Sequence, residues 1–276
     1  MKKTRYWALL AALAVTSAGN LEAAEPALAS PGAVAAPVVA DSAVVADAAA
    51  AVKDPAAMAA LVQMGAYLRA IKAFQVSSEA VKEDVLDDGQ KVSSSSRVEM
   101  LVARPNRARI QVSSDDQQRL YLYDGKTATV WAGLQGFYAT VPAPGTLLEL
   151  VNMFNNKYNI EVPLQDLFFW GTDKSDPGAI TSAIDMGSAT MGGVTCEHYV
   201  FRQPGLDWQL WVQLGDHPLP RKLVITTTDN DARPQFSSVI TWNLAPSYNE
   251  EAFKFEPPAD AKKIALAEAL PNSPEK

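Results

Sequence analysis

Most of the chain alternates apolar and polar residues, the pattern of strands that bury one face. The alternation extends, with short turns, through residues 74–142 and again through 180–242. In the first part, Asp124-Gly125 separates two alternating stretches, and this pair favours a tight type I′ hairpin turn. Consecutive strands with short connections predict an antiparallel meander.

Two stretches replace this alternation with helical spacing. The first begins at Asp54-Pro55, an N-cap residue followed by proline at the first helical position. Gly65 interrupts its apolar stripe, and we expect this glycine to mark a close approach of the helix to the sheet. The second stretch, 144–170, has apolar residues at three- and four-residue steps, and Pro163 is expected to begin a short second helix within it.

These elements predict an α+β fold that is mainly antiparallel β, with a strongly curved sheet, an N-terminal helix and mid-chain helices on the concave side. The 144–170 segment has more apolar surface than one sheet contact needs, so its helices are either deeply buried or cover an apolar cavity. The side chains expected to line such a cavity are Phe74, Met100, Tyr121, Trp131 and Tyr138 from the strands, and Leu147, Leu150, Phe154, Leu167 and Trp170 from the helical segment.

The first residues have the composition of a secretory signal. Three cations precede an apolar stretch, 7–15, that is too short to span a bilayer. An A-x-A cleavage signal ends at Ala29, and cleavage after Ala18 is the alternative. Without a cysteine nearby, no lipid anchor is expected, and the expected location is the periplasm. The expected organisation is a cleaved signal peptide at 1–29, a disordered Ala/Pro/Val-rich spacer at 30–53, one domain at 54–265 and a frayed tail at 266–276.

The composition of the chain argues against several classes of partner and site. The chain has a net charge of −7 and no basic cluster, which argues against nucleic acid as a partner. Cys196 is the only cysteine, so an intrachain disulfide is excluded. His198 and His217 are the only two histidines of the chain, so there are too few ligands for a zinc site, and no cofactor is expected. A nucleophilic thiol would need an oriented base, so we interpret Cys196 as a small buried residue and His198 as a hydrogen-bonded structural one.

Trp211 and Arg221 are candidates for contacts at the rim or surface. Trp211 stands between two glutamines, on the strand face opposite Trp208 and Leu210. It is either an exposed contact residue or packs under a neighbouring segment. Alternation places Arg221 and Lys222 on opposite faces. Arg221 could therefore hold a phosphate or carboxylate at the cavity rim, or be a solvated strand residue.

Several motifs occur in a fixed order along the chain. They are MGAYL at 64–68, YDGKT at 123–127, YATVPAPGT at 138–146, CEH at 196–198, DWQLW at 207–211, PLPRKL at 218–223 and FKFEPP at 253–258. In this order they resemble the LolA/LolB lipoprotein-carrier superfamily, and more closely a family of predicted periplasmic bacterial proteins of unknown function within it. The resemblance covers about 54–265 and implies an unclosed barrel with a helical lid over an apolar cavity, which in the carriers holds acyl chains.

The sequence therefore predicts a periplasmic, non-enzymatic carrier whose partner is a lipid, a lipidated protein or another hydrophobic molecule. The alternative is an envelope protein-interaction or stress-sensor module with a filled cavity. An enzyme is the third hypothesis, and the sequence has no Ser-centred elbow, phosphate-binding glycine loop or carboxylate pair to support it. No permanent membrane anchor is expected.

Overall fold

The structure, a computed structural model, describes residues 52–269. Its helices are α1 (Pro55–Ala70), α2 (Leu147–Lys157) and α3 (Asp166–Phe169), with 3-10 helices η1 (Pro177–Ala179) and η2 (Glu250–Phe253). The strands are β1 (Ala73–Val85), β2 (Lys91–Ala103), β3 (Arg107–Ser113), β4 (Gln118–Tyr123), β5 (Thr127–Ala132), β6 (Phe137–Pro142), β7 (Ser182–Met191), β8 (Val194–Gln203), β9 (Leu206–Gln213), β10 (Pro220–Thr227), β11 (Gln235–Asn243) and β12 (Lys262–Lys263). The expected signal peptide and all but the last two residues of the expected spacer lie outside the described residues.

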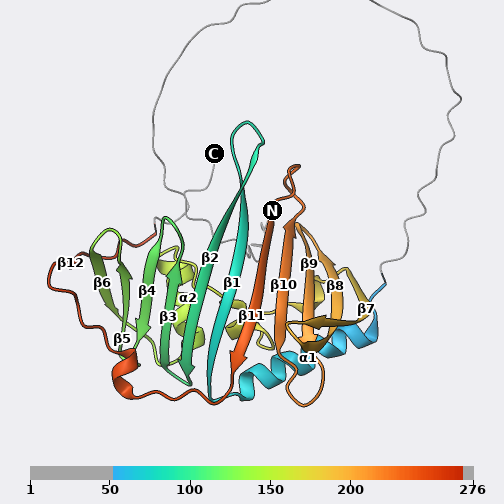
Figure 1. Ribbon diagram of the computed structural model, residues 1–276, viewed down its shortest axis with the longest axis horizontal. Helices are drawn as coiled ribbons and strands as arrows, with labels where there is room; N and C mark the ends of the chain where they lie inside the picture. Colours follow the sequence, from blue (N-terminus) through green and yellow to red (C-terminus); the bar gives the residue numbers. More distant parts are fainter. Residues whose placement is uncertain (1–51, 270–276) are drawn as a thin grey trace, which may run out of the picture. The chain divides into compact units, whose positions relative to one another are not determined.

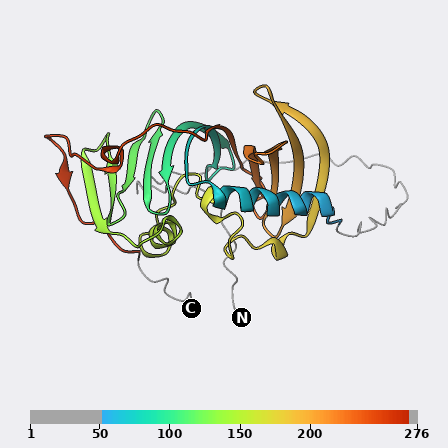
Figure 2. The same cartoon turned by 90° about the horizontal axis from the view of Figure 1, so that it is seen from below.

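The strands form one sheet in the order β12-β6-β5-β4-β3-β2-β1-β11-β10-β9-β8-β7 (Figure 1). Every neighbouring pair is antiparallel except β12 with β6, which is parallel. The sheet curves around the helices, and within residues 52–269 its two end strands, β12 and β7, do not pair with each other (Figure 2). The predicted fold class, a curved and unclosed antiparallel sheet with an N-terminal helix and a helical insert, is confirmed.

The hairpin between β4 and β5 forms at the predicted place with a different turn. The Asp124 amide donates to Thr127 O at 3.2 Å, and Gly125 has a φ of +89°. A type I′ turn needs positive φ at both central residues, whereas here only the first one, Gly125, has it, as in type II′. The Asp124 carboxylate accepts hydrogen bonds from the amides of Lys126 and Thr127 at 2.8 and 2.7 Å, which explains the choice of aspartate.

Helix α1 begins as the sequence predicts. The Asp54 side chain accepts a hydrogen bond from the Ala56 amide at 2.8 Å, and Pro55 occupies the first turn. Its buried face, which includes Met64 and Leu68, packs on the half of the sheet formed by β7 to β10. The helix therefore covers one half of the concave side, as the blue helix in Figure 2 shows.

Gly65 marks a close approach, but to a loop and not to the sheet. A Cβ atom added to Gly65 would lie 2.8 Å from Gly171 Cα, in the loop that follows α3. One turn further along α1, Arg69 donates a hydrogen bond to the Gly171 carbonyl. The expectation of a contact with the sheet was wrong because helix spacing shows which face is crowded and not what crowds it.

Helices α2 and α3 cover the other half of the sheet. Thr146 caps α2 by accepting from the Glu149 amide at 3.3 Å, and its hydroxyl donates to the Glu149 carboxylate at 2.8 Å. The second helix begins at Asp166 and not at Pro163, because Leu164 has a φ of +55° and interrupts any helix from Pro163. From here on, the lid means residues 144–170.

The two halves share one continuous core. Ile71, Trp170, Trp242 and Leu244 pack against both the cluster under the lid and the cluster under α1. The lid is therefore joined to the rest of the protein by packing as well as by its connecting loops.

The C-terminal segment crosses the sheet face opposite the helices before it reaches β12 (Figure 2). Phe253 is fully buried there. After β12, Leu266 packs against the cluster under the lid, the Ala269 amide donates to Lys157 O at 2.7 Å, and Glu268 pairs with the Lys157 ammonium at 3.0 Å. Residues 266–269 are therefore docked on α2 and not frayed as expected, while 270–276 lie outside the described residues.

Candidate functional site

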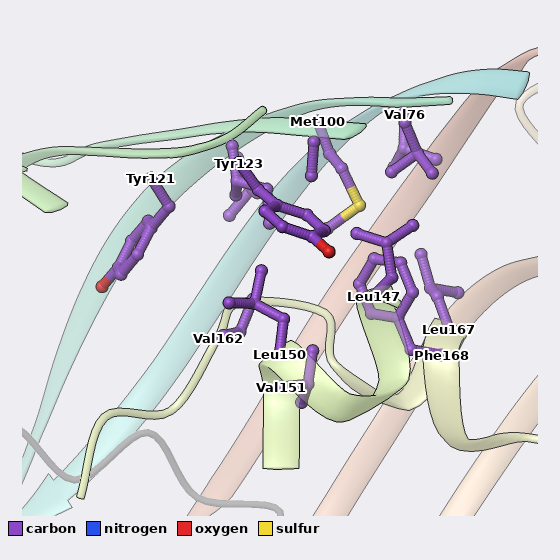
Figure 3. Packing of buried hydrophobic residues seen from close by; sticks show 14 of the residues in the cluster. Val76, Met100, Tyr121, Tyr123, Leu147, Leu150, Val151, Val162, Leu167 and Phe168 are labelled. Carbon is purple, nitrogen blue, oxygen red and sulfur yellow. The ribbon is translucent and has the colours of Figure 1, made fainter. Parts of the chain in front are cut away.

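The candidate site is the apolar interface between the lid and the concave side of β1 to β5. Phe74, Met100 and Tyr121 face it from the sheet, and their side chains are buried. The ring of Tyr121 meets the edge of Phe154 from α2, with centroids 6.4 Å apart and an interplanar angle of 74°. Figure 3 shows Met100 and Tyr123 projecting from the strands toward Leu147, Leu150 and Val151 of the lid, with Tyr121 to their left.

The lid contributes the side chains that its helical spacing predicts. Leu147, Leu150, Phe154 and Leu167 are each at most 5% exposed. Trp170 is half-buried, and it lies where the lid meets the α1 half of the core. The structure therefore brings eight of the ten expected cavity residues into the two clusters under the helices.

Trp131 and Tyr138 are the other two, and the structure places them on the opposite face of the sheet. They pair across β5 and β6, and the ring of Phe255 lies 6.4 Å from Trp131 and 5.0 Å from Tyr138. Their neighbours Val130 and Ala139, by contrast, are buried and pair with each other, and Val130 belongs to the cluster under the lid. The prediction for both residues was wrong, because the C-terminal segment covers the outer face here and makes that face aromatic as well.

Some side chains of the site were not singled out from the sequence. Ile110, Tyr123, Val162 and Phe168 all line the space between lid and sheet. Tyr123 is fully buried, and its hydroxyl donates to the carbonyl of Pro144 at the start of the lid. The alternation of β3 and β4 contains the signal for Ile110 and Tyr123, which share a face with Ala108 and Tyr121. Nothing local distinguishes Val162, which lies in a loop.

Little space remains at this interface. The cavity between α2 and the sheet has a volume of about 20 Å³, which is about enough for one water molecule. Its lining consists of Ala108, Ile110, Tyr121, Leu122, Tyr123, Leu147, Leu150, Val151, Phe154, Val162 and Phe168. Of the two alternatives that the sequence left open, the structure shows the lid helices deeply buried, in a closed arrangement.

Two ionisable groups lie at the edge of this apolar region. Asp166, the first residue of α3, is buried, and the loss of hydration together with the nearby Glu161 carboxylate raises its pKa to about 7. Arg104 lies over the ring of Phe168 at 5.8 Å, and burial lowers its pKa. Arg104 also donates to Leu68 O at 3.4 Å, so it connects α1 with α3.

Trp211 belongs to a stack on the sheet face opposite α1. The His198 ring lies parallel to it with centroids 4.0 Å apart, and the Lys222 ammonium is 4.7 Å from its ring. His198 also makes a hydrogen bond with Gln209 at 3.1 Å. Neighbouring strands thus account for the position of Trp211.

Arg221 does not reach the lid interface. Its guanidinium donates twice to the Gln213 side chain, at 2.9 and 2.5 Å. The register of β10 against β9 shifts between Pro220 and Lys222. Because this irregularity interrupts the alternation, Arg221 and Lys222 both contact outer-face residues, and the prediction of opposite faces was wrong.

The described residues offer few groups suited to metal binding or nucleophilic catalysis. Within residues 52–269, no group of three or more His, Cys, Asp or Glu side chains is arranged to hold a metal ion. The Cys196 thiol is buried, burial raises its pKa, and it lies 3.6 Å from Val194 O. No helix in this part of the chain is long and apolar enough to span a membrane.

Several solved structures overlap with part of this fold. The lipoprotein LppX of Mycobacterium tuberculosis has 11% identity and a TM-score of 0.36, covering 71% of this chain and 100% of its own. LprF of Mycobacterium bovis has 10% identity and a TM-score of 0.37, with 76% and 99% covered. A LolA superfamily protein of Nitrosomonas europaea has 12% identity and a TM-score of 0.29, with 72% and 97% covered.

The family match is more direct. No curated protein matches the chain significantly. A family model described as "Predicted periplasmic protein (DUF2092)" matches residues 57–267, which span α1 to the docked C-terminal segment. The chain belongs to this family of predicted periplasmic proteins.

Proposed function

We propose that the protein is a periplasmic, non-enzymatic carrier that binds a lipid, the acyl part of a lipidated protein or another hydrophobic molecule between the sheet and the lid. The observation that supports this most is the lining of the lid interface, whose eleven residues are all apolar or aromatic. Such a lining suits the binding of acyl chains, whereas catalysis needs positioned polar groups. Export through a cleaved signal peptide at 1–29 belongs to the same proposal.

Binding at this site requires the lid to move, because a cavity of about 20 Å³ is far too small for an acyl chain. Helix α2 buries Leu147, Leu150, Val151 and Phe154, and burying one such side chain stabilises by about 1.5–3 kcal/mol. An acyl chain of about a dozen carbons gains roughly 10 kcal/mol on leaving water. The four side chains together contribute about 6–12 kcal/mol, which is similar to the gain from the acyl chain. A ligand of that length could therefore replace the contacts of α2 and still be released.

Mass spectrometry under native conditions tests the proposal. The mature protein, purified gently from its host, is expected to carry a co-purified hydrophobic molecule, and the emptied protein is expected to bind an environment-sensitive apolar dye. The bound molecule should displace the dye. Protein that carries nothing and does not bind the dye would rule the proposal out.

A second candidate is the interaction or stress-sensor module with a filled cavity, favoured by the small volume that remains under the lid. Its contact surface would include Trp211, whose indole is only half-buried in its stack with His198. Retention of a specific envelope protein by the wild type but not by Trp211→Ala, with dye binding absent from both, would favour this candidate.

A further inference from the structure

The sheet face opposite α1 has a groove that is separate from the lid. Its volume is about 540 Å³, within the range of about 300–1,000 Å³ that is typical of ligand sites. It is lined by Lys91, Ser182, Ile184, Val200, Phe201, Arg202, Asp207, Trp208, Gln209, Thr226, Ala232, Arg233 and Gln235. These residues come from β7 to β11, from the start of β2 and from the loop between β10 and β11.

The alternation of the strands places this groove on the outer face. Ile184 follows Ala183, which packs in the cluster under α1, and Val200 lies between two residues of that same cluster. Ile184 and Val200 are also directly paired across β7 and β8. Side chains that neighbour inward-facing residues on a strand point away from α1, so the groove is open to a ligand without any movement of the lid.

Two arginines converge at one end of the groove. Arg202 donates to both carboxylate oxygens of Asp207, at 2.6 and 2.9 Å, and Arg233 donates to Asp207 Oδ2 at 3.1 Å. The pKa of Asp207 is lowered, chiefly by its hydrogen bonds to Arg202. One carboxylate therefore positions two guanidinium groups and leaves one positive charge in excess.

The other cation of the groove is already neutralised. Lys91 pairs with Glu83 at 3.0 Å, and Glu83 also accepts from the Gln235 amide at 2.9 Å. The excess charge of the groove thus resides on the arginine pair. It stands out in a chain with a net charge of −7.

The arginine pair has donors to spare. Arg202 uses Nε and Nη2 for Asp207, and Arg233 uses Nη2, whereas each guanidinium has five N–H groups. Arg233 has a φ of +46°, in the left-handed region that non-glycine residues seldom adopt. Its amide donates to the Asn230 carbonyl at 2.8 Å, and its guanidinium is held beside Asp207 by their hydrogen bond.

Apolar side chains lie next to this charged end. Ile184 is 43% exposed although it is a strand residue, and Val200 beside it is half-buried. The pairing of Ser182 with Arg202 and of Ile184 with Val200 puts the apolar pair two residues along the strands from the arginine. The groove thus combines a positively charged end with an apolar floor.

We propose that this groove binds a small anionic amphiphile, one molecule at a time, with its carboxylate or phosphate group held by Arg202 and Arg233 and its apolar part over Ile184 and Val200. Guanidinium groups bind both of these oxyanions in a bidentate manner. The site is independent of the proposed lid site, so failure of either leaves the other intact.

Isothermal titration of the folded protein with dodecyl phosphate, below its micelle concentration, tests the proposal. We expect saturable binding that weakens by about tenfold or more in Arg202→Gln, since a hydrogen bond to a charged group accounts for about that factor. Arg233→Asn should weaken binding similarly, and asparagine tolerates the left-handed backbone better than most residues. Ile184→Ser should weaken the binding of dodecyl phosphate and leave that of inorganic phosphate unchanged.

The matched control is Arg97→Gln. Arg97 is an exposed arginine outside the groove that pairs with Glu99 at 2.7 Å, so its replacement removes one charge of the same kind. The proposal is overturned if dodecyl phosphate does not bind, or if Arg97→Gln weakens binding as much as Arg202→Gln. It is equally overturned if inorganic phosphate binds as tightly as dodecyl phosphate, or if neutral dodecyl maltoside binds equally well.

A final experiment distinguishes the binding of a single molecule from binding to a membrane surface. If the protein sediments with phosphatidylglycerol vesicles but does not bind monomeric dodecyl phosphate, the groove is a membrane contact and the proposal is overturned. Saturable binding of the monomer that is lost in both arginine variants supports it.

Discussion

Gly65 of α1 and Gly171 of the loop after α3 meet backbone to backbone, so closely that a Cβ on Gly65 would lie 2.8 Å from Gly171 Cα. This contact fixes the distance between α1 and the end of the lid. We expect Gly65→Ala to force the two segments apart, although alanine favours a helix by about 1 kcal/mol over glycine. The steric effect should dominate, because the opposing atoms are backbone and cannot rotate away. The variant should unfold at lower urea concentration.

The control for this variant is Ala66→Gly, at the exposed neighbouring position of the same helix. It should cost about 1 kcal/mol from helix propensity alone and leave amide exchange in the lid unchanged. A more stable Gly65→Ala protein would show that the contact between the two glycines does not determine how closely α1 approaches the end of the lid.

Asp166 makes stability depend on pH. Its pKa is about 7 in the folded protein, above the value of about 3.9 in an unfolded chain. The folded state therefore binds the proton more tightly. The resulting stabilisation is complete below about pH 4, declines as the pH rises toward 7, and is lost above that, a change of up to about 4 kcal/mol.

We expect Asp166→Asn to resemble the protonated side chain and to flatten this dependence. Urea denaturation at pH 5 and pH 8 should show a larger stability loss for the wild type than for the variant. Equal losses in the two proteins would mean that Asp166 is ionised in the closed lid.

The docked C-terminal segment should hold α2 in place. Truncation after Ala261 removes β12 and the contacts of Leu266, Glu268 and Ala269 with the lid cluster and Lys157. One lost hydrogen bond and one partly buried leucine amount to about 1–2 kcal/mol. Amide exchange in α2 should accelerate by about tenfold, measured by hydrogen exchange with mass spectrometry. Truncation after Ala269 retains every one of these contacts, and if both truncations exchange alike, the segment does not restrain the lid.

Enlarging the lid cavity should increase uptake of apolar molecules. Phe154 is 2% exposed and packs against Tyr121 and Tyr158, so Phe154→Ala should cost about 3–5 kcal/mol of stability and leave a void. We expect stronger binding of an apolar dye than in the wild type, measured by fluorescence. Phe137→Ala, at an exposed position on β6 (39% exposed), is the matched control and should change neither property. Unchanged dye binding in Phe154→Ala would show that the size of the lid cavity does not determine ligand uptake.

Much of the fold could be predicted from the sequence because its elements are locally determined. The start of α1 depends on Asp54 and Pro55, and the strands depend on an alternation that one buried face imposes. The faces of Trp131 and Tyr138 were mispredicted because both faces of β4 to β6 are covered. Leu120, which pairs with Trp131, is also buried, so no polar face is left to identify the outside.

The site was harder to predict than the fold, because it depends on contacts between residues that are far apart in the sequence. The helical spacing of the lid identifies Leu147 and Phe154, but the space left beneath them depends on how side chains from separate strands fit together. The irregularity beside Pro220, which places Arg221 on the outer face, likewise has no local signal. The outer groove could not be predicted from the sequence, because Arg202, Asp207 and Arg233 come from three separate positions and converge only in the folded chain.

The central claim is that a hydrophobic ligand binds between the lid and the sheet, and photo-crosslinking tests it most directly. The probe is a neutral long-chain alcohol with a diazirine near its end, which lacks the charge that the outer groove recognises. We predict crosslinks to peptides containing Tyr121 of β4 and Leu150 or Phe154 of α2, suppressed by the co-purified molecule. Crosslinks confined to peptides of the outer groove around Ile184 and Val200, or no crosslinks at all, would contradict the account.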